Sequence, residues 1–408
     1  MRSLHKTVGR VARKLALTSA SLSALTLVAL CGATASAYGA PLVPGSDSQV
    51  VEVLPAARGA RVAERQLQQR LATNVHDAGA AVALAQLYMQ QARGLGDARF
   101  AGRAMGALTA WREPEKAPSE VLMMVATVQQ YLHDFDTAAA NLERLLQREP
   151  LHPQALLTLA TVRRVQGRYG PSDAACQMLQ KAGQSLYARA CSAENRGLRG
   201  ETDAARADLQ ELLAASARNA DVQAWLLVSL AELELRSGAV AAAEKHFRDS
   251  LALASDDYAR LGLVDLLLDD ARPQQALALT DTMARSDATL VRRAIAARRA
   301  GAPSARADAD ELRARFDQAA QRQQLQSGAN RPARTHAREL AMFALWVEDR
   351  PALAVELARE NTRLQREPID VLLLARAAMA AQQPGVVREA QQIQREVGLH
   401  DVRINTIH

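Results

Sequence analysis

Aromatic residues and cysteines are scarce in this sequence. Phe, Trp and Tyr make up 3% of the 408 residues, and there are three cysteines. Strands favour aromatic and β-branched side chains, so a composition rich in Ala and Leu argues against a β-sandwich and for closely packed helices. No CxxC pair is present, which leaves a zinc or thioredoxin-type site without support.

Catalytic motifs are also missing. The eight histidines are scattered, and none forms HExxH or another ligand spacing. The chain has no GxSxG, no phosphate-binding loop and no GxGxxG after a strand. The sequence therefore predicts neither catalysis nor a metal site, and it calls for no cofactor.

Only one long hydrophobic run occurs, and it lies at the N-terminus. Residues 15–30 are apolar with interspersed Ser and Thr, follow five basic residues, and precede Ala35-Ser36-Ala37. This order is typical of a secretory signal peptide, with cleavage after Ala37. An uncleaved anchor, or lipidation at Cys31, is the alternative. The prediction is a periplasmic or secreted protein without stable membrane insertion after cleavage.

The excess of positive charge is concentrated in that signal. Removing residues 1–37 takes away five basic residues and no acid, which lowers the formal net charge from +6 to +1. A nucleic-acid partner needs a basic stripe on the folded domain. The nearly neutral mature chain therefore predicts no nucleic-acid binding.

What the sequence does contain is internal repetition. Similar helix-like blocks occur at 156–179, 226–247 and 261–279, each with small residues at fixed places and a central turn. A repeat of about 34 residues is the mark of a helical solenoid, in which each unit buries its apolar face on its neighbours. The sequence therefore predicts an all-α solenoid with an extended binding surface.

The blocks resemble the tetratricopeptide repeat, a pair of antiparallel helices A and B. The family has apolar residues at repeat positions 4, 7 and 24, small residues at 8 and 20, and a proline near 32. The block from Ser119 fits best. Its residues at positions 4, 7, 8, 20, 24 and 32 are, in that order, Leu122, Val125, Ala126, Ala138, Leu142 and Pro150. Small residues at positions 8 and 20 let the two helices approach closely. A mid-repeat glycine ends helix A, and the proline ends helix B.

The resemblance implies an α–α superhelix of eight or nine helix pairs, preceded by a signal peptide. We expect an irregular segment and a capping helix over 38–77, with the helix at 60–73. The solenoid follows over 78–322, with its best repeats at 119–280 and extra residues inserted around Arg93–Asp97. A loop at 323–334, further helix pairs at 335–397 and a tail at 398–408 complete the prediction.

Two cysteines remain after the signal. Cys176 falls on a B helix and Cys191 on the next A helix, and their midpoint lies at the intervening turn between Gly183 and Gln184. Residues equidistant from an antiparallel turn face each other, so their Cα atoms fall within disulfide range. Export to an oxidising compartment favours a bond. The alternative is a pair of buried free thiols, which pack as small hydrophobic residues.

The family resemblance also implies partner-binding residues, because helix A lines the concave face of such solenoids. Position 9 in successive units includes Glu194, Glu232 and Asp265, with Trp225 and Tyr258 at position 2. These residues predict an acidic patch for a basic peptide. Gln130, Tyr131 and Arg164 form a more mixed patch. The alternative is ordinary solvated helix faces.

The sequence thus predicts an exported scaffold that binds a protein or peptide in its concave groove, in the bacterial cell envelope. One alternative is a polysaccharide-export or envelope-assembly subunit that uses the solenoid as the frame for ligand binding or catalysis. Another is a purely structural spacer.

Overall fold

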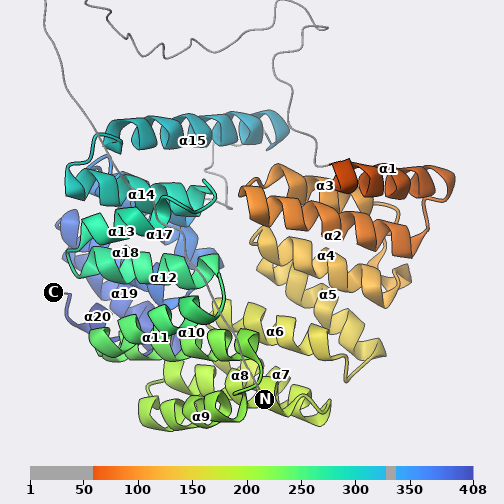
Figure 1. Cartoon of the computed structure of the whole chain (residues 1–408), viewed down its shortest axis with the longest axis horizontal. Helices are drawn as coiled ribbons and strands as arrows, with labels where there is room; N and C mark the ends of the chain where they lie inside the picture. The colour runs from red at the N-terminus through yellow and green to blue at the C-terminus, as the bar shows by residue number, and fades with distance from the viewer. Residues whose placement is uncertain (1–57, 328–336, 408) are drawn as a thin grey trace, which may run out of the picture. The chain divides into compact units, whose positions relative to one another are not determined.

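Helix pairs joined by short turns follow one another along the chain. The structure is a computed structural model that describes residues 58–327 and 337–407. Over these ranges nine consecutive pairs stack in chain order, flanked by a single helix at each end (Figure 1). The predicted all-α fold of helix pairs is confirmed. The predicted signal peptide and its cleavage after Ala37 lie outside the described residues.

The first helix of each pair is called helix A and the second helix B. The A helices are α2 (Ala78–Leu95), α4 (Ser119–Tyr131), α6 (Pro153–Val165), α8 (Ser185–Leu198), α10 (Ala220–Ser237), α12 (Asp257–Asp269), α14 (Asp287–Ala300), α16 (Ala337–Trp346) and α18 (Pro368–Ala380). The B helices are α3 (Arg99–Ala107), α5 (Phe135–Arg148), α7 (Tyr169–Lys181), α9 (Thr202–Ala215), α11 (Val240–Leu253), α13 (Pro273–Thr280), α15 (Ala305–Ser327), α17 (Pro351–Leu364) and α19 (Pro384–Val397). Outside the pairs lie α1 (Arg58–Thr73), the short 3-10 helix η1 (Pro114–Lys116) and α20 (Val402–Asn405).

Small residues set the spacing of each pair. Ala126 on α4 and Ala138 on α5 are fully buried between their helices, and Ala205 and Ala243 are fully buried in later repeats. A larger side chain at such a site would overpack the interface, at a cost of about 1–3 kcal/mol. Leucines such as Leu142 fill the remaining space. The predicted alternation of small and large residues therefore produces the observed close packing.

The turn between helices A and B uses a left-handed backbone conformation in most repeats. Glycine takes it at Gly167, Gly200, Gly238 and Gly301, with φ between 65° and 88°. Repeats without that glycine adopt positive φ all the same, at His133, Ala271, Asp349 and Gln382. This conformation costs a non-glycine residue roughly 1–2 kcal/mol. The packing of the pair therefore imposes the turn even where the local sequence opposes it.

Two predicted loops differ from the structure. Helix α2 continues through Gly94 to Leu95, so the extra residues around Arg93–Asp97 lengthen a helix that ends at Gly96. Helix α15 continues to Ser327, five residues into the range predicted as a loop from 323. The rest of that predicted loop lies outside the described residues. Gly94 and Gly96 gave the first place its loop-like look, and at 323–327 the polar composition hid good helix formers such as Gln and Leu.

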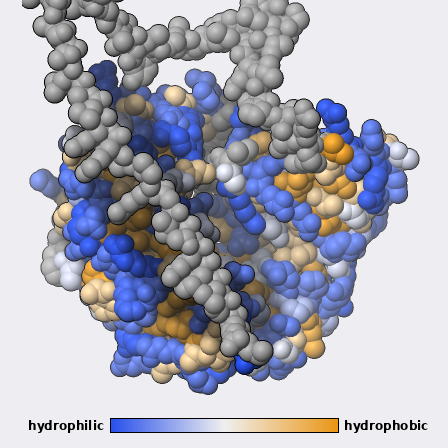
Figure 2. Space-filling model, in the orientation of Figure 1, coloured by the Kyte–Doolittle hydropathy of each residue, from blue (hydrophilic) through white to orange (hydrophobic). Residues whose placement is uncertain are grey.

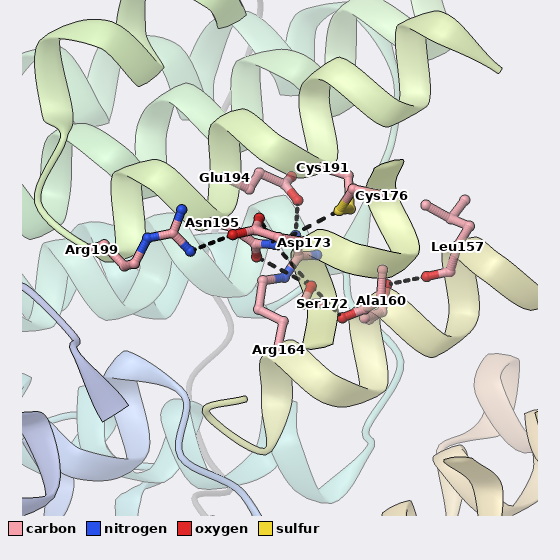
Figure 3. Close-up of a disulfide and its surroundings, with 11 residues drawn as sticks. Leu157, Ala160, Arg164, Ser172, Asp173, Cys176, Cys191, Glu194, Asn195 and Arg199 are labelled. Atoms are coloured by element: carbon pink, nitrogen blue, oxygen red, sulfur yellow. Dashed lines mark hydrogen bonds and ion pairs between the residues drawn. A yellow bond between two sulfur atoms is a disulfide. The ribbon is translucent and has the colours of Figure 1, made fainter. Parts of the chain in front are cut away.

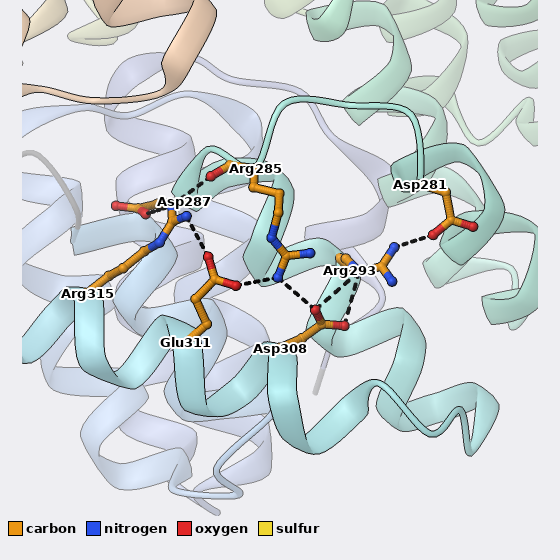
Figure 4. Close-up of polar contacts among 7 residues, drawn as sticks. All are labelled: Asp281, Arg285, Asp287, Arg293, Asp308, Glu311 and Arg315. Carbon is orange, nitrogen blue, oxygen red and sulfur yellow. Dashed lines mark hydrogen bonds and ion pairs between the residues drawn. The ribbon is translucent and has the colours of Figure 1, made fainter. Parts of the chain in front are cut away.

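Helix α15 is polar because it pairs with arginines. The carboxylate of Asp308 is almost fully buried and accepts hydrogen bonds from Arg285 at 3.0 Å and Arg293 at 3.1 Å (Figure 4). Arg315 on the same helix donates to Asp287 on α14 at 3.0 Å. Its apolar contribution to the core comes from Leu312 and Phe316. Ion pairs thus hold a helix whose apolar stripe is narrow.

The last residues, predicted as a tail, are packed into the protein. Leu399, Ile404 and Ile407 are buried in the same hydrophobic cluster as Leu198 and Val228 of the middle repeats. Asp401 is fully buried and caps α20 by accepting a hydrogen bond from the Arg403 amide. The predicted tail at 398–408 thus contributes buried side chains to the core and contains the short helix α20.

The stretch 397–402, called the C-terminal strap here, runs along three turns of the middle repeats. The His400 amide donates to the Leu198 carbonyl at 2.7 Å. A Cβ added at Gly167 would lie 2.8 Å from Val397 Cγ1, one at Gly200 would lie 3.0 Å from His400 Cβ, and one at Gly238 would lie 3.3 Å from Val402 Cγ2. Successive turn glycines therefore make room for successive strap residues.

Candidate functional site

A row of polar side chains links the A helices of the middle repeats. Arg164 on α6 pairs with Glu194 on α8, which also accepts a hydrogen bond from Ser229 Oγ on α10 at 2.6 Å. Asp265 on α12 accepts hydrogen bonds from Nε and Nη2 of Arg292 on α14, each at 2.7 Å. We call this row, together with Glu232 and Tyr258, the A-helix face. Each contact joins neighbouring repeats, so the row orders side chains across several helices.

Glu232 on α10 is the exception in this row. Its carboxylate accepts a hydrogen bond from the hydroxyl of Tyr258 on α12, and it forms no ion pair with any described residue. Burial raises the pKa of Glu232, while Arg236 and the Tyr258 hydroxyl act in the opposite direction. The negative charge of Glu232 in turn raises the pKa of Tyr258 well above its ordinary value. Within the described residues Glu232 is thus an acid without a cationic partner in contact.

The predicted acidic patch is therefore uneven. Glu194 and Asp265 have their charges compensated by Arg164 and Arg292, whereas Glu232 does not. The structure brings Trp225, Glu232 and Tyr258 onto neighbouring helices, since Trp225 lies two turns before Glu232 on α10. The sequence identified the acids but carried no information about which of them has an arginine opposite.

One residue of this face escaped the sequence analysis. Tyr187 on α8 stacks at a tilt against Trp225, with ring centroids 5.7 Å apart. It stands seven residues before Glu194, as Trp225 stands before Glu232 and Tyr258 before Asp265. Tyr187 is 38% exposed and Tyr258 is 60% exposed. The shared offset of seven was a signal that would have found Tyr187.

The predicted mixed patch of Gln130, Tyr131 and Arg164 is not assembled by these contacts. Tyr131 on α4 donates its hydroxyl hydrogen to the Ala92 carbonyl of α2 at 3.2 Å. Arg164 is committed to Glu194 on the next A helix. Gln130 is half-buried beside Tyr131 on α4. The first repeats and the middle repeats thus use these side chains for different internal contacts.

Cys176 and Cys191 form a disulfide between α7 and α8, with their Cα atoms 5.8 Å apart (Figure 3). Both cysteines are buried. The adjacent Asn195 is fully buried and donates to Ser172 Oγ at 2.9 Å and to Asp173 at 2.8 Å. This cross-link lies one turn away from Glu194, so it fixes the helix that carries Tyr187 and Glu194.

A pocket lies where four separate segments of the chain meet, at 133–136, 166–168, 363–366 and 396–397. This pocket has a volume of about 260 Å³ and is lined by His133, Asp134, Phe135, Asp136, Gln166, Gly167, Arg168, Arg363, Leu364, Arg366, Glu396 and Val397. Its lining combines basic and acidic side chains, and Asp136 already accepts a hydrogen bond from Gln166 at 2.8 Å. The mixture of signs does not define one class of ligand.

Three other kinds of site were sought among residues 58–327 and 337–407. No group of three or more His, Cys, Asp or Glu side chains is placed to hold a metal ion. None of these helices has the length and apolar character needed to cross a membrane. On the face shown in Figure 2, hydrophobic residues form separate patches among hydrophilic ones. We therefore take the A-helix face as the candidate site.

The chain is similar in structure to three solved proteins. A tetratricopeptide repeat protein from Parabacteroides merdae shares 17% identity over 64% of this chain and 98% of its own, with a TM-score of 0.37. Rap protein complexed with competence and sporulation factor shares 10% identity over 83% of this chain and 98% of its own, with a TM-score of 0.48. A human IFIT1 dimer with m7Gppp-AAAA shares 12% identity over 87% of this chain and 96% of its own, with a TM-score of 0.41. All three scores lie below 0.5, so the repeat type rests on this chain's own helix pairs.

No family model matches the chain. None of the curated proteins matches it either.

Proposed function

We propose that this protein is an exported interaction scaffold of the bacterial cell envelope, which holds a segment of a partner protein on its A-helix face. The fold supports an interaction role, because stacked helix pairs display a continuous surface built from many repeats. Export rests on the signal-like residues 1–37 of the sequence. We propose no catalytic role.

One observation carries the choice of surface. Side chains of successive A helices touch each other across repeats, as in Arg164–Glu194–Ser229 and in Glu232–Tyr258. Such contacts hold the side chains in place before a partner arrives, which lowers the entropy lost on binding. The partly exposed rings beside them supply area for contact.

Site-specific photo-crosslinking in cells tests the surface. A photoreactive phenylalanine replaces Tyr187, and a matched variant carries it at Lys245, which is exposed on helix B α11. We expect a distinct protein to be cross-linked from position 187 alone, and we expect that protein, once purified, to bind the full mature chain. Equal cross-linking from both positions, or none from position 187, would contradict the proposal.

Mass determination of the mature N-terminus tests export. Cleavage after Ala37 predicts a chain that begins at Tyr38 and is recovered from the periplasmic fraction or the medium. An intact N-terminus or a lipid on Cys31 would instead indicate an anchored protein.

A further inference from the structure

The A-helix face contains an acid, Glu232, that no cation contacts within residues 58–327 and 337–407, next to an exposed aromatic ring. Glu232 differs from its equivalents because Glu194 and Asp265 each have an arginine at hydrogen-bond distance. Arg236 and Arg164 also interact electrostatically with Glu232, but Arg236 is buried and neither arginine forms an ion pair with Glu232. Electrostatically, Glu232 is placed to gain from a positive charge supplied from outside.

The ring of Tyr258 adds a second attraction for the same kind of group. Its hydroxyl is bonded to Glu232 and its side chain is 60% exposed, so solvent reaches both the ring and its surroundings. A carboxylate beside an aromatic face favours a guanidinium or ammonium group, which can pair with the acid and lie over the ring. Glu367 of α18 and Arg338 of α16 also act on Tyr258, with opposite signs.

A second feature of the face lies a fixed distance away. Trp225 precedes Glu232 by seven residues on α10, which corresponds to about 10 Å along a helix at 1.5 Å per residue. Its ring contacts that of Tyr187 at an interplanar angle of 36°, and we call the two rings the Tyr187–Trp225 platform. An extended peptide advances about 3.3 Å per residue, so about three residues bridge the two features.

On the basis of the proposed scaffold function, we propose that Glu232 and Tyr258 bind an arginine or lysine side chain of an extended partner segment. The Tyr187–Trp225 platform then receives an apolar side chain three residues before or after that cation. The partner is thus a protein segment defined by a cationic and an apolar residue at a spacing of three. Asp221 and Asp257, exposed at the start of α10 and α12, add negative charge, while Arg218 in the α9–α10 connection adds one positive charge.

Synthetic peptides test the proposal on the full mature chain. The probes are fluorescein-labelled decapeptides of Gly and Ser that carry Arg and Leu three residues apart, in either order. In matched peptides citrulline replaces Arg, which keeps the shape and removes the charge. Of the two orders of Arg and Leu, one will bind better. In that order, fluorescence anisotropy should show that the citrulline peptide binds about five- to tenfold more weakly than the Arg peptide. Equal affinity for the Arg and citrulline peptides, or no binding by either, overturns the proposal.

Variants locate the binding. Glu232→Gln keeps an acceptor for the Tyr258 hydroxyl but should abolish the preference for Arg over citrulline. Tyr258→Phe keeps the ring and should retain much of that preference, whereas Tyr258→Ala should lose it. Asp249→Asn on α11 removes one surface charge elsewhere and should leave peptide affinity unchanged. A preference that survives Glu232→Gln, or one lost in Asp249→Asn, contradicts the assignment.

The outcomes also separate this site from the scaffold function. A cross-linked partner that binds Glu232→Gln as well as the unaltered chain would leave the scaffold standing and reject the cation site. Circular dichroism melting of each variant identifies any that fails to fold. The peptide comparison on the unaltered chain decides the question without them.

Discussion

The middle repeats and the C-terminal repeats are built from the same kind of helix pair but use it differently. On α8, α10 and α12 the rings of Tyr187 and Tyr258 reach solvent and the acids are partly exposed. On α18 the equivalent surface is covered, and Asp370 is fully buried among Arg338, Asn361 and its own helix terminus. A repeat either displays its A helix or buries it, according to what the rest of the chain packs against it.

The largest expected effect concerns the buried A helix α18 of the C-terminal repeats. Burial raises the pKa of Asp370 to about 6, against the attraction of Arg338, so the carboxyl is ionised at neutral pH. Arg338→Ala would leave that buried charge without its partner and cost about 3–5 kcal/mol of unfolding free energy. Chemical denaturation at pH 7.5 measures it. Arg359→Ala removes a half-exposed pair with Glu389 and should cost at most about 1 kcal/mol.

The disulfide distinguishes the middle repeats. It closes a loop with a sequence separation of 15 between α7 and α8. Replacing both cysteines with serine should lower stability by about 3 kcal/mol in the loop-entropy model. Denaturation of the variant beside the oxidised protein measures the loss. Free-thiol labelling of the unfolded protein provides the control, and two reactive thiols in protein from the periplasm would contradict the bond.

A third effect lies where the two regions meet. Gly167 and Gly183 both have positive φ, but only Gly167 faces the C-terminal strap, at Val397. A Cβ added at Gly183 would meet no other atom within 4 Å. Gly183→Ala should therefore cost only the left-handed backbone penalty of about 1–2 kcal/mol. Gly167→Ala should cost about 1–3 kcal/mol more through the clash. Equal losses in denaturation would show that the strap does not press on this turn.

The smallest effect concerns pH and the middle repeats alone. Burial lowers the pKa of His246 on α11, and its Nδ1 is buried without a hydrogen-bond partner in the described residues. The unfolded chain therefore binds a proton more readily than the folded one, so stability falls as the pH drops below the ordinary value of 6.5. His246→Gln should reduce the loss of stability between pH 7.5 and pH 5.5. An unchanged pH dependence would argue against a neutral His246 in the folded state.

Much of the fold could be predicted because its cause is local. The period of apolar and small residues specifies each helix pair, and Ala126 and Ala138 are buried as that period requires. Of the candidate site, the sequence indicated Glu194, Trp225, Glu232, Tyr258 and Asp265. It could not indicate that arginines face two of the three acids, because the residue opposite an A helix belongs to a neighbouring repeat and its side-chain direction depends on packing.

By itself, the sequence determined the pairing of helices, the approximate number of repeats and the side chains available on each A helix. These follow from spacing within about 34 residues, over which burial of an apolar face is a local matter. Only the tertiary structure decided that Glu232 has no cation in contact among the described residues, that His133 and Gln382 adopt a glycine-like turn, and that residues 397–407 pack on the middle repeats. Those outcomes depend on contacts between residues as far apart as Leu198 and His400, and no local pattern encodes a contact at that separation.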